Sequence, residues 1–491
     1  MSKARWLYGA SVQGIQKYIF QTNDLKDIIG ASELVNQICS ESGEKFKALF
    51  EQGELYQAAA GNIRYLFDSE EACRKAVRLF PKYAMETAPG IVVSQAVVQV
   101  NGENCTKEDF NKLEQKLHAQ RNKPVKSMTL GCMAMKRFQK TGLPEVYKKE
   151  GEAVDECTSK KRETAEHTNL MLACKLMDRK DVRYKDLNLD ASKMNDKNDW
   201  IAIIHADGNG LGEVVANISS EKRKSFSKAL DNATISAAHR AYEAVKVSED
   251  KASIRPIVIG GDDLTVICRA DIAVDFVKSY LKCFEEETDE KLGNTRICSH
   301  KLTACAGIAF IKSSYPFYYG YELAETLCGL AKKDAKSDAM KKKNDGLAPS
   351  CLMFHKVQSS FVEDYEAIQK KELTLKNGTL LNFGPYYLSE QDERWTIDDL
   401  LGIVKKMPAD ENGPVKTSVR KWLTLMHDND MAAEQLKKRF QTLIDSNSQK
   451  LYEDALKCEE REGKKYCPAY DILSLVTIKY QVTQEDKDKK A

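Results

Sequence analysis

Two short apolar runs near the middle of the chain predict a β-hairpin. Residues 256–259 and 264–268 are rich in β-branched side chains, and they flank the tetrapeptide Gly260-Gly261-Asp262-Asp263. Strand-like runs separated by a few Gly and Asp residues are typical of two antiparallel strands joined by a tight turn. The pattern therefore places two neighbouring carboxylates at the tip of a hairpin.

Another apolar run, residues 201–206, predicts a buried strand that ends at Asp207. The glycine-rich turn after it consists of Gly208, Asn209, Gly210, Leu211 and Gly212. The remaining predicted elements of this unit are a helix at 219–245, a helix at 271–288, a strand at 301–312 and a helix at 322–343. The order strand, helix, hairpin, helix, strand is that of a ferredoxin-like βαββαβ sheet, in which Asp207 lies beside the hairpin.

The first 120 residues repeat this order of elements. Their predicted elements are a strand at 5–11, two helices up to residue 38 with a break at Gly30, a hairpin at 54–67, a helix at 69–86 and a strand at 91–100. The tip of this hairpin consists of Ala59, Ala60, Gly61 and Asn62 and carries no carboxylate. The N-terminal unit therefore has the predicted fold of the second unit without its acidic residues.

The two units cover residues 1–120 and 198–355. The remaining segments, 121–197 and 356–491, do not show the order of strands and helices of these units. Residues 121–197 are polar, and we expect loops with one helix at 159–176. Residues 356–491 predict a small helical domain, with helices at 397–405, 415–428, 431–445 and 470–478 and a charged, disordered tail at 484–491. The predicted fold class is α+β, with two ferredoxin-like domains side by side and a small α-helical C-terminal domain.

Composition narrows the classes of function. The chain has 75 Lys and Arg against 73 Asp and Glu, a formal net charge of +2, so no overall basic field favours nucleic-acid binding. Its 14 cysteines include no C-x-x-C pair, which favours reduced, buried thiols over disulfides. No apolar run approaches the ~18 residues that span a membrane, and the N-terminus lacks a signal-peptide core. We expect a cytoplasmic protein with no membrane partner.

The paired aspartates are the main candidates for chemistry. Neighbouring carboxylates repel each other, and their burial is unfavourable unless a cation lies between them. A solvated turn is the alternative, because Gly and Asp are ordinary turn residues. Asp207 favours the metal site, since carboxylates from neighbouring strands can hold two Mg²⁺ ions about 3.5–4 Å apart for phosphoryl transfer. The backbone N–H groups of the turn after Asp207 are suited to cradling phosphates.

Several motifs resemble the palm domains of the large subunit of type III CRISPR effector complexes. Those of the catalytic palm are GGDD at 260–263, ADGNGLG at 206–212, LTACAGIAFIKSSYPF at 302–317 and LAETLCGLAKKDAK at 323–336. Those of the first palm are GASVQGIQKYIF at 9–20 and TNDLKDIIGASELV at 22–35. The resemblance implies a degenerate first palm (1–120), a connector (121–197), a catalytic palm (198–355) and a helical C-terminal domain (356–491). It also implies synthesis of cyclic oligoadenylate or cyclic di-adenylate from ATP, with release of pyrophosphate.

The resemblance also implies roles for individual residues. Asp207, Asp262 and Asp263 would be catalytic and would bind Mg²⁺ or Mn²⁺. Lys332 matches a lysine that reaches the triphosphate of ATP, although a surface lysine on a basic helix is the plain alternative. The nucleotide-binding positions would be Gly208, Asn209, Gly210, Leu211, Gly212, Gly260, Gly261 and Lys332.

The first palm would pack against the second and help to hold the other nucleotide. Its candidates for polar contacts are Ser11, Gln13 and Asn62. The alternative is that Ser11 and Asn62 only cap a helix and shape a turn.

Two other functions of the chain stay open. One is a nucleotide-binding regulatory or scaffold subunit without turnover, against which the three intact carboxylates argue. Another is a diguanylate cyclase that uses GTP, against which the Asp-Asp tip and the doubled palm argue. Two disfavoured sites are a zinc site at Cys132, Cys157, His167 and Cys174, and a His-Asp nuclease site at His427 and Asp428.

Nucleoside triphosphates are the expected partners of the chain. The neutral charge, and a first palm with no nuclease domain before it, favour a solitary enzyme of antiviral signalling over a subunit of a guide-RNA complex. The sequence leaves open a homo-oligomer, the base, the ring size, the linkage and the activating signal.

Overall fold

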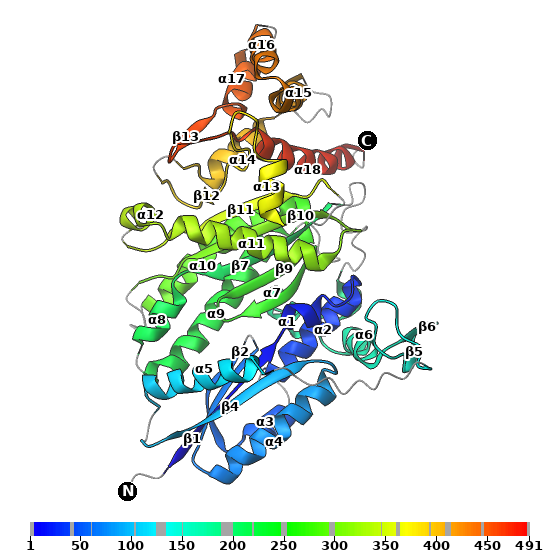
Figure 1. Cartoon of the computed structure of the whole chain (residues 1–491), viewed down its shortest axis with the longest axis vertical. Helices are drawn as coiled ribbons and strands as arrows, with labels where there is room; N and C mark the ends of the chain where they lie inside the picture. The colour runs from blue at the N-terminus through cyan, green and yellow to red at the C-terminus, as the bar shows by residue number, and fades with distance from the viewer. Residues whose placement is uncertain are drawn as a thin grey trace.

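The computed structural model describes most of the chain. The described residues are 4–39, 44–59, 61–102, 105–123, 134–149, 151–187, 200–218, 220–246, 253–293, 300–344, 346–359, 364–391, 394–407, 414–442 and 446–488. Figure 1 shows two sheets one above the other, with the N-terminal sheet below, the second sheet in the middle and the C-terminal helices above. Strand β1 (Arg5–Gln13) therefore lies in the lower part of the view, and α18 (Ala469–Asp488) lies in the upper part, below α15, α16 and α17 (Figure 1).

The N-terminal sheet is antiparallel and has the strand order β2-β3-β1-β4. Its strands are β1 (Arg5–Gln13), β2 (Gly53–Ala59), β3 (Asn62–Phe67) and β4 (Val92–Val100). The helices of this part are α1 (Ile15–Ile19), α2 (Leu25–Cys39), α3 (Glu44–Phe50), α4 (Glu70–Thr87) and α5 (Lys107–Arg121). Neighbouring residues of β1 enter different cores, Leu7 with residues of α5 and Tyr8 with residues of α3 and α4, so helices cover both faces.

The second sheet has six strands in the order β12-β11-β10-β7-β9-β8. Its strands are β7 (Trp200–Gly208), β8 (Ile254–Gly260), β9 (Asp263–Arg269), β10 (Ala304–Lys312), β11 (Cys351–Lys356) and β12 (Tyr386–Tyr387). The helices between them are α8 (Leu211–Asn217), α9 (Ser220–Val245), α10 (Ala273–Thr288), α11 (Phe317–Ala335), α12 (Asp338–Lys343) and α13 (Tyr365–Lys371). Both faces of β7 are buried, because residues 201–204 are all 0 % exposed.

Both sheets contain the predicted ferredoxin-like core, and the α+β class is confirmed. Strands β10-β7-β9-β8 repeat the order β4-β1-β3-β2 of the N-terminal sheet. The second sheet has two further strands. Strand β11 pairs in parallel with β10, and β12, which comes from beyond residue 355, pairs with β11. The sequence analysis did not predict β11. The domain boundaries at residues 120, 197 and 355 stay predictions.

The connector and the C-terminal region are mainly helical. The connector contains β5 (Tyr147–Lys149), β6 (Glu152–Val154), α6 (Glu156–His167) and α7 (Met171–Met177). The C-terminal region contains α14 (Ile397–Lys406), α15 (Pro414–Asp428), α16 (Asp430–Gln441), α17 (Ser446–Ala455), β13 (Glu459–Arg461), β14 (Lys464–Tyr466) and α18 (Ala469–Asp488). Among the described residues, no helix combines the length and apolar character needed to cross a membrane.

Several predicted element boundaries are wrong. The single helix predicted at 159–176 is two helices, because α6 ends at His167 and α7 begins at Met171. The helix predicted at 322–343 is likewise divided into α11 and α12. Part of the tail predicted to be disordered is helical, since α18 continues to Asp488.

Gly30 does not break a helix as predicted, because α2 runs through it. A Cβ atom at Gly30 would lie 1.9 Å from the carbonyl oxygen of Lys161 in α6. Neighbouring contacts also hold α6 in place: Lys161 Nζ donates to the Tyr18 carbonyl of α1 (2.7 Å), and Arg162 Nε donates to Asp27 Oδ1 of α2 (2.9 Å). Gly30 is therefore the position where the connector backbone docks on the N-terminal unit.

Gly30→Ala is expected to destabilise the protein by about 2–4 kcal/mol, because the added methyl group meets rigid backbone. Thermal and urea unfolding would measure this effect. The matched control is Gly402→Ala in α14, where a Cβ atom meets nothing within 4 Å. The control should be neutral or stabilising by up to about 1 kcal/mol. Equal unfolding midpoints for the two variants would contradict the docking role of Gly30.

Candidate active site

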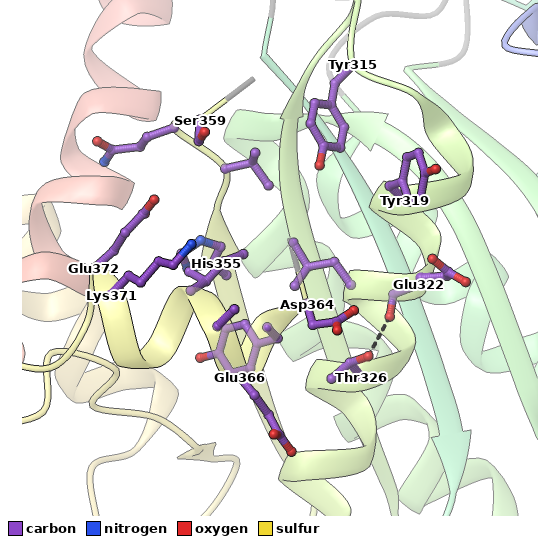
Figure 2. A pocket seen from close by; sticks show the side chains of 16 residues that line it. Tyr315, Tyr319, Glu322, Thr326, His355, Ser359, Asp364, Glu366, Lys371 and Glu372 are labelled. Carbon is purple, nitrogen blue, oxygen red and sulfur yellow. Dashed lines mark hydrogen bonds between the residues drawn. The ribbon is translucent and has the colours of Figure 1, made fainter. Parts of the chain in front are cut away.

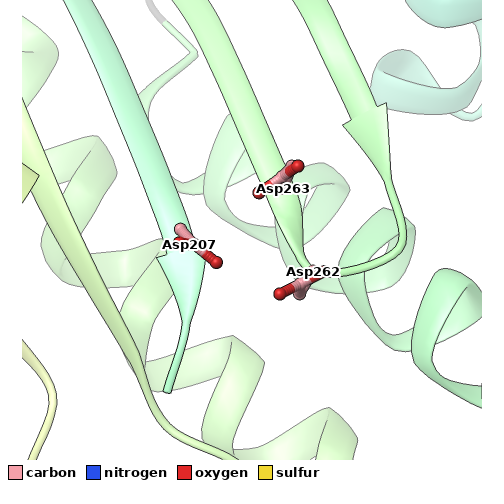
Figure 3. Close-up of side chains that lie close together, drawn as sticks. All are labelled: Asp207, Asp262 and Asp263. Atoms are coloured by element: carbon pink, nitrogen blue, oxygen red, sulfur yellow. The ribbon is translucent and has the colours of Figure 1, made fainter. Parts of the chain in front are cut away.

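Three carboxylates meet at one edge of the second sheet. Asp207 lies near the end of β7, Asp262 lies in the turn of the hairpin, and Asp263 is the first residue of β9. Antiparallel pairing of β7 with β9, which sets Ala206 opposite Leu264, brings the two segments together. One carboxylate oxygen of each aspartate lies within 4.8 Å of the others, and Figure 3 shows the three side chains around one space.

The electrostatics of this cluster favour a bound cation. Burial, together with the charge of Asp207, raises the pKa of Asp262 to about 7. Burial and the neighbouring charge of Asp262 raise the pKa of Asp263 to about 8. Ionised carboxylates are therefore unfavourable here without a positive partner. Three hard oxygen donors that need a positive partner suit Mg²⁺ or Mn²⁺.

Lys332 supplies positive charge to this cluster. Its ammonium group forms an ion pair with Asp207 and donates a 2.7 Å hydrogen bond to the carbonyl oxygen of Gly208. Helix α11 can carry Lys332 to this place because it packs directly on β10. A Cβ atom at Gly307 of β10 would lie only 2.0 Å from the Ala324 carbonyl oxygen of α11. The structure thus places Lys332 beside the predicted catalytic aspartates.

The glycine-rich turn after Asp207 begins with a residue that is bonded to the rest of the protein and ends with residues that line a cavity. The N–H of Asn209 donates to the Thr303 carbonyl (2.8 Å), and its side-chain amide donates to Thr303 Oγ1 (3.0 Å). These two hydrogen bonds anchor the turn, and Asn209 is only 6 % exposed. Its N–H is already bonded and is therefore not free to bind a phosphate in the way that the sequence analysis proposed. Leu211 and Gly212, at the start of α8, line the cavity beside the aspartates.

Two residues of α9, which the sequence analysis missed, hold the tip of the β8–β9 hairpin. Asp231 Oδ1 accepts a 3.0 Å hydrogen bond from the N–H of Gly261, and Thr234 Oγ1 donates a 2.6 Å hydrogen bond to the Gly261 carbonyl. The i, i+3 spacing puts both side chains on one face of the helix. This clamp fixes the backbone immediately before Asp262.

Thr234→Val is expected to lower the turnover rate of a reaction at the three aspartates about tenfold to hundredfold, with little change in the KM for its substrate, because the variant keeps its shape but releases the Gly261 carbonyl. Thr234→Ser retains the hydroxyl and should restore kcat. Steady-state kinetics of both variants, with their melting temperatures, would measure this. A loss of kcat in Thr234→Ser equal to that in Thr234→Val would contradict the positioning role.

A cavity of about 450 Å³ connects the β8–β9 hairpin to the N-terminal sheet. Asp262 and Asp263 line it from the second sheet, and Asn62 and Arg64 of β3 line it from the first. The Arg64 guanidinium donates to Gln57 and Glu114. Arg64 was not predicted, although its spacing of two residues from Asn62 puts both on one face of β3.

The other candidates for polar contacts in the N-terminal unit, Ser11 and Gln13, form hydrogen bonds within that unit. Ser11 lies opposite Asn62 in the β1–β3 pair, and its hydroxyl accepts a 2.9 Å hydrogen bond from Arg121. Gln13 Nε2 donates to the Ser11 carbonyl. Ala60, at the tip of this hairpin, lies outside the described residues.

Within the described ranges, the three aspartates are the only group of three or more His, Cys, Asp or Glu side chains close enough to share a metal ion. Of the candidates for a zinc site, Cys132 lies outside the described residues, Cys157 and Cys174 are buried free thiols, and the side chain of His167 is 72 % exposed beside Glu166. His427 and Asp428 end α15.

A comparison of sequences with protein families gives one match to this region. Residues 200–341 match the family model Cas10/Cmr2, second palm domain. This part of the chain is a Cas10-like second palm. The match spans β7 to α12 and includes Asp207, the β8–β9 hairpin and Lys332. No curated protein matches the chain in sequence.

Solved structures share the fold of the whole chain around the Cas10-like palm. A Csm1-Csm4 cassette in complex with cA4 aligns over 98 % of this chain and 70 % of its own, with a TM-score of 0.58 and 12 % sequence identity. A cassette in complex with AMPPNP aligns with the same coverage and TM-score at 13 % identity. A Csm1-Csm4 subcomplex of the type III-A CRISPR-Csm interference complex aligns equally well at 12 % identity. The predicted resemblance to type III CRISPR large subunits is confirmed.

Proposed function

We propose that this protein is a nucleotidyl cyclase that joins ATP molecules into a cyclic oligoadenylate by phosphoryl transfer. The observation that carries the proposal is the cluster of Asp207, Asp262 and Asp263 with Lys332, open to a cavity between the two sheets. Transfer of a nucleotidyl group needs an activated 3′-hydroxyl, neutralised charge on the phosphate and a stabilised pyrophosphate.

The residues of the second palm would divide this work. Asp207, Asp262 and Asp263 would hold Mg²⁺ or Mn²⁺, which when bound lowers the pKa of the attacking hydroxyl and neutralises phosphate charge. Lys332 would move its ammonium group from Asp207 to the triphosphate and stabilise the leaving pyrophosphate. Because Asp231 and Thr234 fix the hairpin, the carboxylates stay aligned while the nucleotides exchange.

The first palm would hold the second nucleotide opposite the carboxylates. Lys107 supplies positive charge to its wall of the cavity, and Arg64, which pairs there with Glu114, would turn to a nucleotide phosphate. Tyr56 and Phe110 line the same wall, with ring centroids 5.6 Å apart, and present aromatic surface to a base. Asn62 would add a polar contact, as predicted, and the lack of acidic residues at this hairpin leaves catalysis to the second palm.

The relatives support the choice of substrate and product. Csm1-Csm4 cassettes are described in complex with AMPPNP, with pppApA, with cA3 and with cA4. ATP is therefore the substrate that we propose, and a ring of adenylates the product. A role in antiviral signalling follows from this product class and stays a proposal.

The deciding experiment incubates the purified protein with Mg²⁺ or Mn²⁺ and each of the four nucleoside triphosphates, singly and mixed. Mass spectrometry of the products identifies base and ring size, and nuclease digestion identifies the linkage. A cyclic adenylate is the expected product. A cyclic guanylate would replace the proposal with the diguanylate-cyclase reading. Nucleotide binding without turnover under every condition would favour the regulatory or scaffold subunit.

The assembly state is a separate proposal. The relatives are described as Csm1-Csm4 cassettes and subcomplexes, whereas the neutral charge of this chain favours a solitary enzyme. Affinity purification of the tagged protein from its own cells would test this expectation. Recovery of a guide RNA together with the protein would overturn it, and light scattering of the purified protein would determine whether it forms a homo-oligomer.

A further inference from the structure

Two cysteines lie opposite each other at the base of the small hairpin in the C-terminal region. Strands β13 and β14 pair antiparallel with Glu459 opposite Tyr466, so the next pair in the same register is Cys458 and Cys467. The ladder ends at this pair because Pro468, the following residue, has no N–H with which to continue it. The fold of the hairpin therefore brings together two thiols from its two ends.

The backbone contacts of β14 show which kind of pair this is. The N–H of Cys467 donates to the Leu380 carbonyl (2.8 Å), and the N–H of Leu380 donates to the Lys465 carbonyl (2.8 Å). The backbone of Cys467 is thus directed away from β13, as in a non-hydrogen-bonded pair. Residues of such a pair have Cα atoms about 4.5 Å apart and their side chains close together. A disulfide spans Cα separations of about 4.4–6.8 Å, so these two thiols can be joined without moving the strands.

Cys458 has the surroundings of a reactive thiol. Among the cysteines that the structure describes, it alone is partly exposed, whereas Cys467 is 0 % exposed. A hydrogen bond donated by the Cys467 thiol, with the charges of Lys465 and Lys437, outweighs burial and lowers the pKa of the Cys458 thiol to about 7. The thiolate is the nucleophilic form of cysteine, and oxidant-sensitive cysteines are thiolates that solvent can reach.

A metal site and the proposed reaction both leave this pair unexplained. Structural zinc takes four protein ligands, and the three aspartates are the only described group of three or more side chains with metal-binding spacing. Neither the active-site cavity nor the cleft of about 760 Å³ between α11 and α13 (Figure 2) has a cysteine among the described residues that line it. The two thiols are therefore available for chemistry of their own.

We propose that Cys458 and Cys467 form a redox-active dithiol that a peroxide converts into a disulfide. The Cys458 thiolate would attack one oxygen of hydrogen peroxide and break the O–O bond, which gives a sulfenic acid and a hydroxide ion that takes up a proton to become water. The Cys467 sulfur would then attack the sulfenic sulfur and break its S–O bond, and the hydroxyl group would leave with the Cys467 proton as water. The two cysteines lose two electrons, and the peroxide gains them.

A second pair of cysteines provides an internal control. Cys305 Sγ of β10 and Cys351 Sγ of β11 lie 3.6 Å apart, and both side chains are 0 % exposed. Buried thiols of this kind are inert because neither base nor oxidant reaches them in the folded protein. Proximity of two sulfur atoms alone should therefore not lead to oxidation in this chain.

Disulfide mapping of the whole chain, without nucleotide or divalent metal, tests the proposal. The reduced protein is treated with hydrogen peroxide, its free thiols are blocked, and its tryptic peptides are identified by mass spectrometry. Trypsin cuts after Arg461, Lys464 and Lys465, so the expected disulfide joins two separate peptides. We expect this link, its loss on treatment with dithiothreitol, and no link between Cys305 and Cys351.

Single variants distinguish the two thiols. Cys458→Ser should abolish the disulfide. Cys467→Ser retains a hydrogen-bond donor but removes the second sulfur, so the sulfenic acid at Cys458 should persist and be trapped by dimedone. In the unchanged protein at pH 7, iodoacetamide should modify Cys458 at least about tenfold faster than Cys305 or Cys351. Melting temperatures show whether each variant is folded.

Absence of the Cys458–Cys467 link after peroxide treatment overturns the proposal, as does oxidation of Cys305 and Cys351 at the same rate. Equal trapping by dimedone in Cys467→Ser and in the unchanged protein would overturn the role of Cys467. The inference goes beyond the cyclase activity, which is tested by product formation, so either proposal can fail without the other.

Discussion

The double variant Asp262→Asn/Asp263→Asn is expected to lose product formation by at least about a thousandfold, because it removes two of the three carboxylates that would hold the metal ions. Asparagine keeps the size of each side chain but cannot supply the negative charge that the metal requires. The measurement is the initial rate of pyrophosphate release with ATP and Mg²⁺ or Mn²⁺, followed by mass spectrometry of the product. Addition of EDTA to the unchanged protein should give the same loss.

The same variant should be as stable as the unchanged protein in EDTA, or more stable. Because burial raises the pKa values of Asp262 and Asp263 to about 7 and 8, the folded protein binds these protons more tightly than the unfolded chain does. The metal-free protein should therefore lose stability as the pH rises from about 4 to 8, and the variant should lose less of it. Retention of full synthesis, or a collapse of the fold, would contradict the assignment. Glu51→Gln/Glu71→Gln, which alters two exposed carboxylates, controls for charge alone.

Lys332→Ala is expected to reduce kcat by about a hundredfold, because the variant loses the cation that would stabilise the leaving pyrophosphate. The neighbouring Lys333 offers a matched control on the same helix, since it is exposed and only Lys332 contacts Asp207. Lys333→Ala should retain the full rate. The measurement is steady-state kinetics with ATP at saturating Mg²⁺.

The Mg²⁺ affinity of Lys332→Ala would distinguish a role of Lys332 in the reaction from a role in the fold alone. The ion pair with Asp207 competes with a metal ion for the same carboxylate, so Lys332→Ala should need less Mg²⁺ for half-maximal activity or for half-maximal thermal stabilisation. Equal kcat values for Lys332→Ala and Lys333→Ala would remove Lys332 from the reaction.

The β8–β9 hairpin and its neighbouring strand β7 could be predicted because their signals are local. The turn residues Gly260–Asp263 sit between two strand-like runs, and the strand before Asp207 is a continuous apolar segment. The strand order of a βαββαβ unit then determines that these segments pair, and the structure pairs them. The three carboxylates of the candidate site follow directly from that topology.

The features that the sequence analysis missed depend on contacts between distant residues. Gly30 resembles a helix break until α6, some 130 residues later, packs its backbone against it. The hydroxyl of Thr234 has no special pattern in an amphipathic helix, and only the fold brings it to the Gly261 carbonyl. Strand β11 is short and follows a helix, so the apolar run that forms it gives no sign of pairing with β10.

The ion pair between Lys332 and Asp207 has a consequence for how the protein would be switched on. Three clustered, partly buried carboxylates repel one another without a counter-ion, whereas this chain carries its own counter-ion on α11. Loading of metal and nucleotide is then an exchange of charge partners: Asp207 passes from ammonium to metal, and the ammonium passes from carboxylate to phosphate. Neither exchange is favourable without the other, so metal and nucleotide should bind cooperatively, and the resting protein should be protected from loading by metal alone.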